Sequence, residues 1–150
     1  MHLFLVQHGI AKSEAEDPER PLTEEGADAV RRMGAWAVGQ GLVIDQVRHS
    51  GKLRAAETAE ILAGYLGPAE EPFAVPGLGP MDDVRPVADG LGDEGGPIMV
   101  VGHLPFLARL AGLLLAGSAD ATPVAFTNAG IVCLERGAEG WRVEWIEGTE

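Results

Sequence analysis

The apolar run from Pro97 to Val101 constrains the fold more than any other part of the sequence. A continuous run of this kind is typical of a strand that is buried on both faces, as strands are in parallel sheets. The apolar segment Leu104–Ala116 follows almost at once and has the length of a helix. Because a strand buried on both faces needs a covering layer on each side, this part of the chain predicts an α/β fold.

The rest of the chain alternates in the same way between strands and helices. Thr23 is predicted to cap a helix that begins with Glu24 and Glu25 and reaches Gln40, where Gly41 ends it. The other predicted helices are Leu53–Leu66, Val87–Leu91 and Leu104–Ala116, and the predicted strands are His2–Gln7, Val43–Val47, Phe73–Val75, Pro97–Val101, Val124–Phe126, Gly130–Glu135 and Trp141–Ile146. This order predicts that residues 1–150 form a single three-layer α/β/α domain with a mostly parallel central sheet.

Charge and cysteine content narrow the possible partners and compartments. The chain has 150 residues, with 11 Lys and Arg against 23 Asp and Glu, which gives a formal net charge of −12. Such a surface repels nucleic acid and anionic membranes, so neither is an expected partner. Cys133 is the only cysteine and is interpreted as a small buried residue. No segment has the pattern of a signal peptide or of a membrane span, which indicates a soluble, cytoplasmic protein.

Polar residues follow several of the predicted strands. Gln7-His8-Gly9 follows the first strand, His49-Ser50 and Arg54 follow the second, Gly102-His103 follows the buried strand, and Thr127-Asn128 lies near the last strands. Ligands of open parallel sheets bind beyond the carboxyl ends of the strands. We therefore expect His8, Arg54 and His103 to meet at one rim. His49 either reaches this rim or packs beneath it.

The composition of this rim favours an anion over a metal. Zinc sites usually combine histidine with carboxylate or thiolate ligands, and the chain has no H-x-x-x-H or C-x-x-C pattern, so we expect neither a metal nor another cofactor. Arg54 lies near the amino end of its helix, where its guanidinium and free backbone N–H groups can both face a phosphate. A neutral imidazole can attack phosphorus while a second one holds the phosphoryl oxygens. The alternative for His8, His103 and Arg54 is a structural role.

Four segments occur in the order and spacing of a known family: Gln7-His8-Gly9, Arg20-Pro21-Leu22-Thr23-x-x-Gly26, Ser50-x-x-x-Arg54-Ala55-x-x-Thr58 and Val101-Gly102-His103-Leu104-Pro105. Together they resemble the histidine phosphatase superfamily, which includes the cofactor-dependent phosphoglycerate mutases. The short chain and the second and fourth segments are most similar to the SixA-type phosphohistidine phosphatases. The resemblance runs from about residue 1 to residue 130 and implies a phosphoglycerate mutase-like α/β fold that needs no metal.

The resemblance also implies a role for individual residues. His8 matches the nucleophile that becomes a phosphohistidine intermediate, and Arg54 matches the arginine that clamps the phosphoryl group. His103 matches the second histidine, which stabilises the oxygens of the phosphoryl group during transfer. Phosphate-binding contributions are further expected from Gln7, Arg20 and Asn128. Asp82 and Asp83 are the candidates for a general acid, since the loop that holds them approaches the site in the family; their alternative role is to cap or solvate that loop.

Two positions depart from the family pattern. Gln7 stands where the family usually has arginine, and Gly51 stands where it has proline. A charge-assisted hydrogen bond is worth ~1.5–3 kcal/mol against ~0.5–1.5 kcal/mol for a neutral one, so Gln7 is expected to lower catalysis by tens of fold. Arg20 and Lys52 are candidates to supply the missing charge. Gly51 is expected to loosen the turn and to have little other effect.

These features predict a phosphatase that acts on phosphohistidine in a protein, such as a histidine phosphotransfer domain of a two-component relay. The imidazole of phosphohistidine can leave already protonated, so this substrate needs little help from a general acid, whereas an alkyl phosphate ester needs a proton donor. The chain also lacks the long insertion that covers the site in larger family members. Two alternatives remain: a phosphomonoesterase for small molecules, and a non-catalytic domain that binds phosphate or a phosphoprotein because Gln7 replaces arginine.

Overall fold

The sheet has the strand order β3-β2-β4-β1-β5-β6 in the computed structural model, which describes residues 1–148. Strands β1 to β4 are parallel to one another, and β5 pairs antiparallel with both β1 and β6. The strands are β1 (His2–Gln7), β2 (Gln46–His49), β3 (Phe73–Ala74), β4 (Ile98–Gly102), β5 (Ile131–Gly137) and β6 (Gly140–Glu147), and the helices are α1 (Glu24–Gly39), α2 (Leu53–Leu66), α3 (Arg85–Gly90) and α4 (Phe106–Ala116), with a 3-10 turn at Leu91–Asp93. This arrangement confirms the predicted α/β domain with a mostly parallel sheet.

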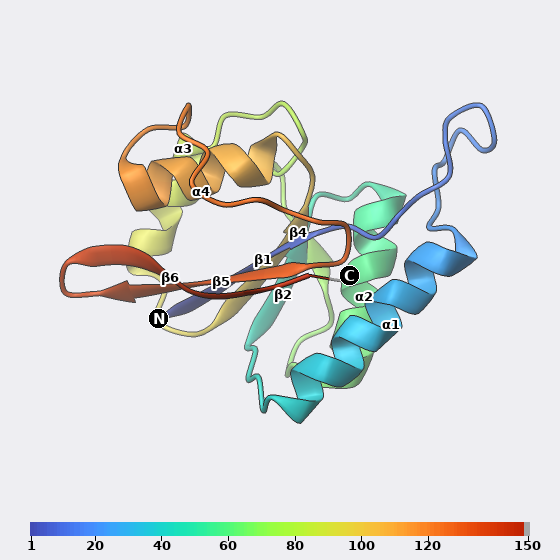
Figure 1. The fold of residues 1–150 in the computed structure, drawn as a ribbon, viewed down its shortest axis with the longest axis horizontal. Helices are drawn as coiled ribbons and strands as arrows, with labels where there is room; N and C mark the ends of the chain where they lie inside the picture. The colour runs from blue at the N-terminus through green and yellow to red at the C-terminus, as the bar shows by residue number, and fades with distance from the viewer. Residues whose placement is uncertain (149–150) are drawn as a thin grey trace.

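Helices cover both faces of the sheet (Figure 1). Phe4 and Val6 of β1 point toward the layer formed by α1 and α2, whereas Leu3 and Leu5 point toward the layer formed by α3 and α4. Strand β4 alternates in the same way and is buried along its whole length. The sheet therefore places two apolar cores back to back, which explains why the run Pro97 to Val101 contains no polar side chain.

Helices α1 and α2 begin and end where local chemistry dictates. Thr23 caps α1, since its hydroxyl oxygen accepts a hydrogen bond from the Gly26 N–H at 2.9 Å. Helix α2 ends at Gly67, which adopts a left-handed conformation with φ of 60°. A Cβ at position 26 would lie 2.1 Å from the Ile10 carbonyl oxygen, so only glycine permits the close approach of α1 to the segment after β1.

Several expected elements differ from the observed ones. The expected strand Val43–Val47 is wrong in its bounds, because β2 spans Gln46–His49. Ile44 is instead buried under the helical layer as part of a loop, and Val43 is 71% exposed. The expected strand Val124–Phe126 is absent from the described residues. Its two apolar side chains pack against the α3/α4 core without pairing into the sheet. The short helix starts at Arg85, two residues earlier than expected, and α4 starts at Phe106.

No helix among residues 1–148 combines the length and the apolar character that crossing a membrane requires.

Candidate active site

The carboxyl ends of three neighbouring strands bring the candidate residues to one edge of the sheet. β4 lies between β2 and β1, and Gln7 of β1 is in register with Gly102 of β4. The backbone N–H of His8 donates to the Gly102 carbonyl oxygen at 3.0 Å, which fixes the start of the segment after β1 beside His103. The imidazole rings of His8 and His103 lie 5.0 Å apart between centroids and are tilted by 55°.

The backbone around His8 fixes the state of its imidazole. Nδ1 lies 2.7 Å from the Gly9 carbonyl oxygen, and because a carbonyl can only accept, Nδ1 carries the proton. The neutral ring therefore has its lone pair at Nε2, the nitrogen available for attack. The His8 carbonyl accepts from Asn128 Nδ2 at 2.9 Å, and the Gly9 N–H donates to Thr58 Oγ1 at 3.0 Å. A Cβ at position 9 would lie 2.9 Å from a methyl of Val30, so glycine is required there.

The second histidine is held by a serine. His103 is only 2% exposed, and its Nε2 lies 2.6 Å from Ser50 Oγ. Ser50 Oγ accepts from the Lys52 N–H at 3.3 Å, and its own proton can donate to His103 Nε2. In that arrangement the remaining proton of the neutral ring is on Nδ1, which is buried and has no hydrogen-bond partner. His103 thus offers one N–H group to whatever occupies the rim.

Unpaired buried polar atoms gather at this rim. Among the described residues, the buried side-chain nitrogen and oxygen atoms without a partner are Gln7 Oε1, Arg54 Nε and His103 Nδ1. An unsatisfied buried polar group costs roughly 1–3 kcal/mol, so a cluster of three indicates a binding site rather than a structural one. Arg54 Nε and His103 Nδ1 are donors, which suits an acceptor such as a phosphoryl oxygen. Rotation of the Gln7 amide would present its NH₂ group in place of its oxygen.

Positive charge concentrates at the rim of this acidic protein. Burial lowers the pKa of His8 below its usual 6.5, the hydrogen bond to Gly9 opposes that change, and the charges of Arg54 and Arg20 add to it. Burial lowers the pKa of His103 to about 3, assisted by the charges of His8, Arg54, Lys52 and Arg20. Both imidazoles are therefore neutral at neutral pH, while the nearby cations attract an anion.

Arg20 reaches the rim through an unusual backbone conformation. Its φ is 50°, in the left-handed region that residues other than glycine rarely adopt. Its Nε donates to the Lys12 carbonyl oxygen at 2.9 Å, and the Lys12 N–H donates to the Pro21 carbonyl oxygen at 2.8 Å. The strained loop holds the Arg20 guanidinium close enough to lower the pKa of Arg54, after burial as the main cause. Arg20 and Lys52 thus add positive charge around His103, and Arg20 also adds it around His8 and Arg54.

Other predicted residues have different surroundings. Asp82 accepts from the Gly79 N–H at 2.7 Å and Asp83 from the Arg85 N–H at 3.0 Å, and neither is among the charges that shift the pKa of the two histidines. His49 accepts from the Gly51 N–H at 3.1 Å, and burial lowers its pKa while the charge of Glu60 opposes this. His49 therefore packs beneath the rim and shapes the turn that presents Ser50.

Two contributors to this geometry stood in the sequence motifs without an assigned role. Ser50 orients His103, and Thr58 joins the rim to α2, since its hydroxyl accepts from the Gly9 N–H and donates to the Arg54 carbonyl oxygen at 2.8 Å. Asn128 was expected to bind phosphate, whereas its amide nitrogen holds the His8 carbonyl. The spacing of four residues between Arg54 and Thr58 was the available signal, because it places both on one side of a helix.

Comparisons with known proteins agree with this geometry. No family model matches the chain. The phosphohistidine phosphatase SixA of Escherichia coli is 35% identical over 147 residues, which cover 93% of this chain and 89% of that protein. A solved structure of the protein histidine phosphatase SixA complexed with tungstate superposes with a TM-score of 0.88 at 30% identity, over 99% of this chain and 97% of that one.

A more distant structure shows the same fold. A phosphoserine phosphatase from Entamoeba histolytica has a TM-score of 0.76 at 16% identity, over 99% of this chain and 98% of that one. At that identity the likeness concerns the fold alone. The 35% identity to SixA extends over nearly the whole length of both chains and therefore shows the family. The rim, where two neutral histidines lie near arginines, agrees with that family. The chain therefore belongs to the SixA phosphatases of the histidine phosphatase superfamily.

Proposed function

We propose that the protein removes the phosphoryl group from a phosphohistidine of another protein, with His8 as the nucleophile. The observation that carries this proposal is the state of the His8 ring: Nδ1–H is bound to the Gly9 carbonyl, and the lone pair of Nε2 lies at the rim beside His103. The substrate and the phospho-His8 intermediate both carry a phosphoryl group on an imidazole nitrogen. Attack by His8 therefore exchanges one P–N bond for another of similar energy.

The reaction needs two displacements at phosphorus. In the first, His8 Nε2 forms a bond to phosphorus while the P–N bond of the substrate breaks and its electron pair returns to the departing ring, which leaves as neutral imidazole because its other nitrogen already carries a proton. In the second, water attacks phospho-His8, the new P–N bond breaks, and inorganic phosphate leaves. Arg54 and His103 Nδ1–H donate to the phosphoryl oxygens, whose charge must be held in both steps.

The surroundings of the rim favour a protein substrate. Ile10, Leu53 and Leu104 are exposed apolar side chains, at 50%, 37% and 41%, and each lies within two residues of His8, Arg54 or His103. A phosphorylated metabolite offers little apolar surface to such a border, whereas a protein that presents a phosphohistidine can bury it. Among residues 1–148, no carboxylate is among the charges that shift the pKa of His8 or His103, and this also suits an imidazole leaving group.

A purified histidine phosphotransfer domain carrying radioactive phosphate on its histidine tests the proposal. We expect loss of the label as inorganic phosphate, with a kcat/KM that exceeds the value for p-nitrophenyl phosphate. Stable label together with efficient hydrolysis of sugar or nucleotide phosphates would favour a phosphomonoesterase for small molecules. Phosphate binding without turnover of either substrate class would favour a non-catalytic binding domain.

The pH dependence should reflect the lowered pKa of His8. Only neutral His8 can attack, so kcat/KM should stay high as the pH falls through 6.5 and should decline only below it. In Arg20→Gln one of the charges that depress this pKa is absent, so the acid limb should move upward. The same substrate is used for wild type and for Arg20→Gln, so its own titration is the same in both pH profiles. The control is Arg85→Gln, which removes an exposed arginine elsewhere. Identical acid limbs in wild type and Arg20→Gln would contradict this account.

Restoring charge at position 7 should increase turnover. Gln7 donates at most a neutral hydrogen bond to the phosphoryl group, whereas arginine would donate a charge-assisted one, so Gln7→Arg should raise kcat/KM by tens of fold. The control is Gln40→Arg, which makes the same change at an exposed position after α1. If Gln7→Arg leaves kcat/KM unchanged, Arg20 and Lys52 already provide the full charge that the phosphoryl group needs.

A further inference from the structure

A second cluster of reactive side chains lies at the opposite end of β1 from His8. The imidazole of His2, the thiol of Cys133 and the carboxylate of Glu144 each offer an atom, and these atoms all lie within 4.8 Å of one another. They come from β1, β5 and β6, which are neighbours in the sheet. His2 and His8 are six positions apart along β1, so roughly 20 Å separates the cluster from the catalytic rim.

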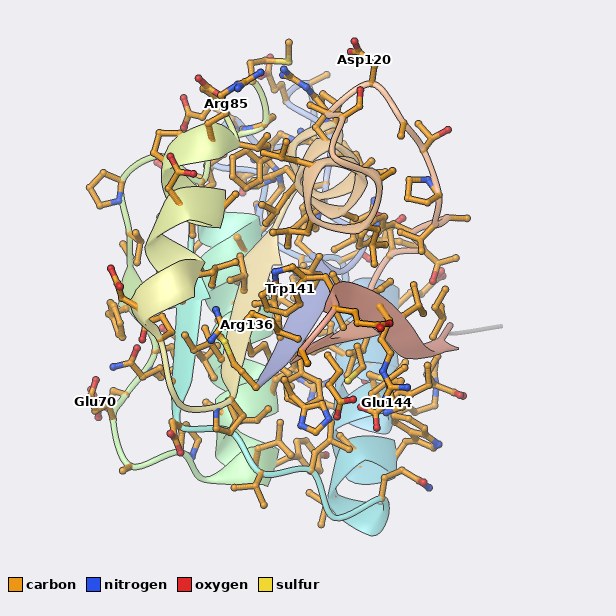
Figure 2. The ribbon with its side chains drawn as sticks, turned by 90° about the vertical axis from the view of Figure 1, so that its left-hand side faces the viewer. Glu70, Arg85, Asp120, Arg136, Trp141 and Glu144 are labelled. Atoms are coloured by element: carbon orange, nitrogen blue, oxygen red, sulfur yellow. The ribbon has the colours of Figure 1, made fainter. Side chains whose placement is uncertain are left out.

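Strand pairing brings these residues together. His2 is paired with Glu135 of β5, and Cys133 is paired with Phe4 of β1, so His2 and Cys133 share one face of the sheet. On β6, Leu134 pairs with Val143 while Cys133 pairs with Trp145, which leaves Glu144 as an extra residue in a bulge. A bulge redirects a side chain that regular alternation would send to the other face. Figure 2 shows Glu144 on the side of β6 that faces α1.

At the cluster, the carboxylates of Glu144 and Glu135 both contact the same nitrogen, His2 Nε2. His2 Nε2 lies 2.6 Å from Glu144 Oε2 and 3.1 Å from Glu135 Oε2. The thiol of Cys133 donates to Glu144 Oε2 at 3.5 Å. An imidazole nitrogen carries at most one proton, so a single N–H faces two carboxylates. Glu135 is held from its other oxygen by the guanidinium of Arg142, which fixes the orientation of its carboxylate.

The cluster is accessible although Cys133 is buried. A surface cavity of about 400 Å³ is lined by all three side chains, together with Phe4, Trp145 and the segment 40–43 that follows α1. Cys133 therefore forms part of the wall of a cavity that a small ion can enter, while Trp145 and Leu42 provide an apolar surround. Within residues 1–148 no other group of three His, Cys, Asp or Glu side chains comes this close together.

We propose that His2, Cys133 and Glu144 bind a divalent transition metal, with Zn²⁺ as the preferred ion. Imidazole nitrogen, thiolate sulfur and carboxylate oxygen are the ligand types that zinc uses, whereas Mg²⁺ and Ca²⁺ require oxygen ligands. Bond lengths of ~2.0–2.3 Å at a tetrahedral zinc place neighbouring ligand atoms about 3.3–3.6 Å apart. The Cys133 to Glu144 separation of 3.5 Å already meets this requirement, and the His2 to Glu144 separation of 2.6 Å must open by under ~1 Å.

The remaining details of the cluster suit this ion. Glu135 lies outside this group of three, and its Oε2, at 3.1 Å from His2 Nε2, is placed to accept from a water bound to the ion. The metal would take the place of the thiol proton, so one proton leaves Cys133 as the ion binds. Since the ligands come from three strands, the bound ion would join the amino end of β1 to the hairpin of β5 and β6 and stabilise that edge of the sheet.

Metal binding by the untagged full-length protein tests this proposal. We expect Zn²⁺ to bind in competition with a chromogenic chelator and Co²⁺ to give a thiolate-to-cobalt charge-transfer band. Zinc at 100 times its Kd should raise Tm by about 5–10 °C. Cys133→Ser, His2→Gln and Glu144→Gln should each weaken binding at least ~100-fold. The matched control is Glu139→Gln, which removes one exposed carboxylate from the β5–β6 turn and should bind zinc like the wild type.

Because the Cys133 side chain is buried, a loss of binding in Cys133→Ser counts only together with the same loss in Glu144→Gln, whose substitution lies on the surface. The proposal is overturned if the cobalt complex lacks the charge-transfer band, or if Glu144→Gln binds zinc as tightly as Glu139→Gln. It is also overturned if His8→Ala or His103→Ala abolishes zinc binding, since the ion would then occupy the catalytic rim.

Discussion

Replacing His8 with alanine should lower phosphatase activity by at least ~1,000-fold and abolish the phosphorylated enzyme intermediate. Of the two histidines at the rim, His8 has the lone pair that a hydrogen bond orients for attack, because the Nε2 atom of His103 is bound to Ser50. The measurement is a rapid quench into alkali with labelled substrate, followed by analysis of the enzyme for phosphohistidine. Wild type should carry label and His8→Ala should carry none.

The folded state of this variant can be checked independently of its activity. His8 is held through its backbone, by its N–H to Gly102 and by its carbonyl to Asn128, and alanine preserves both of these bonds. We therefore expect a Tm close to that of the wild type and retained stabilisation by inorganic phosphate through Arg54 and His103. Label on the His8→Ala enzyme, or a residual rate within tenfold of the wild type, would show that another group is the nucleophile.

The elements that could be predicted most closely are those whose ends carry local signals. Helix α2 spans Leu53–Leu66 as expected, because Gly67 accepts the left-handed conformation that ends a helix and Pro68 cannot extend it. The buried strand was predicted within one residue because burial on both faces leaves an uninterrupted apolar run. The segment Val43–Val47 has apolar residues at both ends, but Val43 is exposed and Ile44 packs into the core beside α1 before the strand begins, so the pairing of Gln46 with Ile98 marks where β2 starts.

The same distinction applies to the site. Parallel topology alone places residues that follow β1, β2 and β4 at one rim, so the sequence was sufficient to bring His8, Arg54 and His103 together. The proton positions were not predictable, because they depend on a backbone carbonyl beside His8 and on the distance of 2.6 Å from Ser50 to His103. The cluster of His2, Cys133 and Glu144 depends on a register shift between antiparallel strands, for which the sequence offers no local signal.

Arg54 is expected to be the other residue whose loss nearly abolishes activity. Its guanidinium can donate two charge-assisted hydrogen bonds of ~1.5–3 kcal/mol each to a phosphoryl group, so Arg54→Ala should lower kcat/KM by roughly 100- to 10,000-fold. Arg54→Lys keeps the charge but not the planar fork, so it should recover only part of that loss. Steady-state kinetics on labelled phosphotransfer domain measure both effects, with the exposed Arg32→Ala as the control for net charge.

The stability of Arg54→Ala distinguishes a catalytic role from a structural one. Arg54 Nε is buried without a partner, and the charge of Arg20 acts against its own, so this side chain contributes repulsion and desolvation to the folded state. We expect Arg54→Ala to be at least as stable as the wild type while losing its protection by phosphate, as happens where a site is built for its ligand at the expense of the fold. A variant that unfolds at a clearly lower temperature, with kcat/KM per folded molecule unchanged, would assign Arg54 to the structure of α2 instead of to the phosphoryl group.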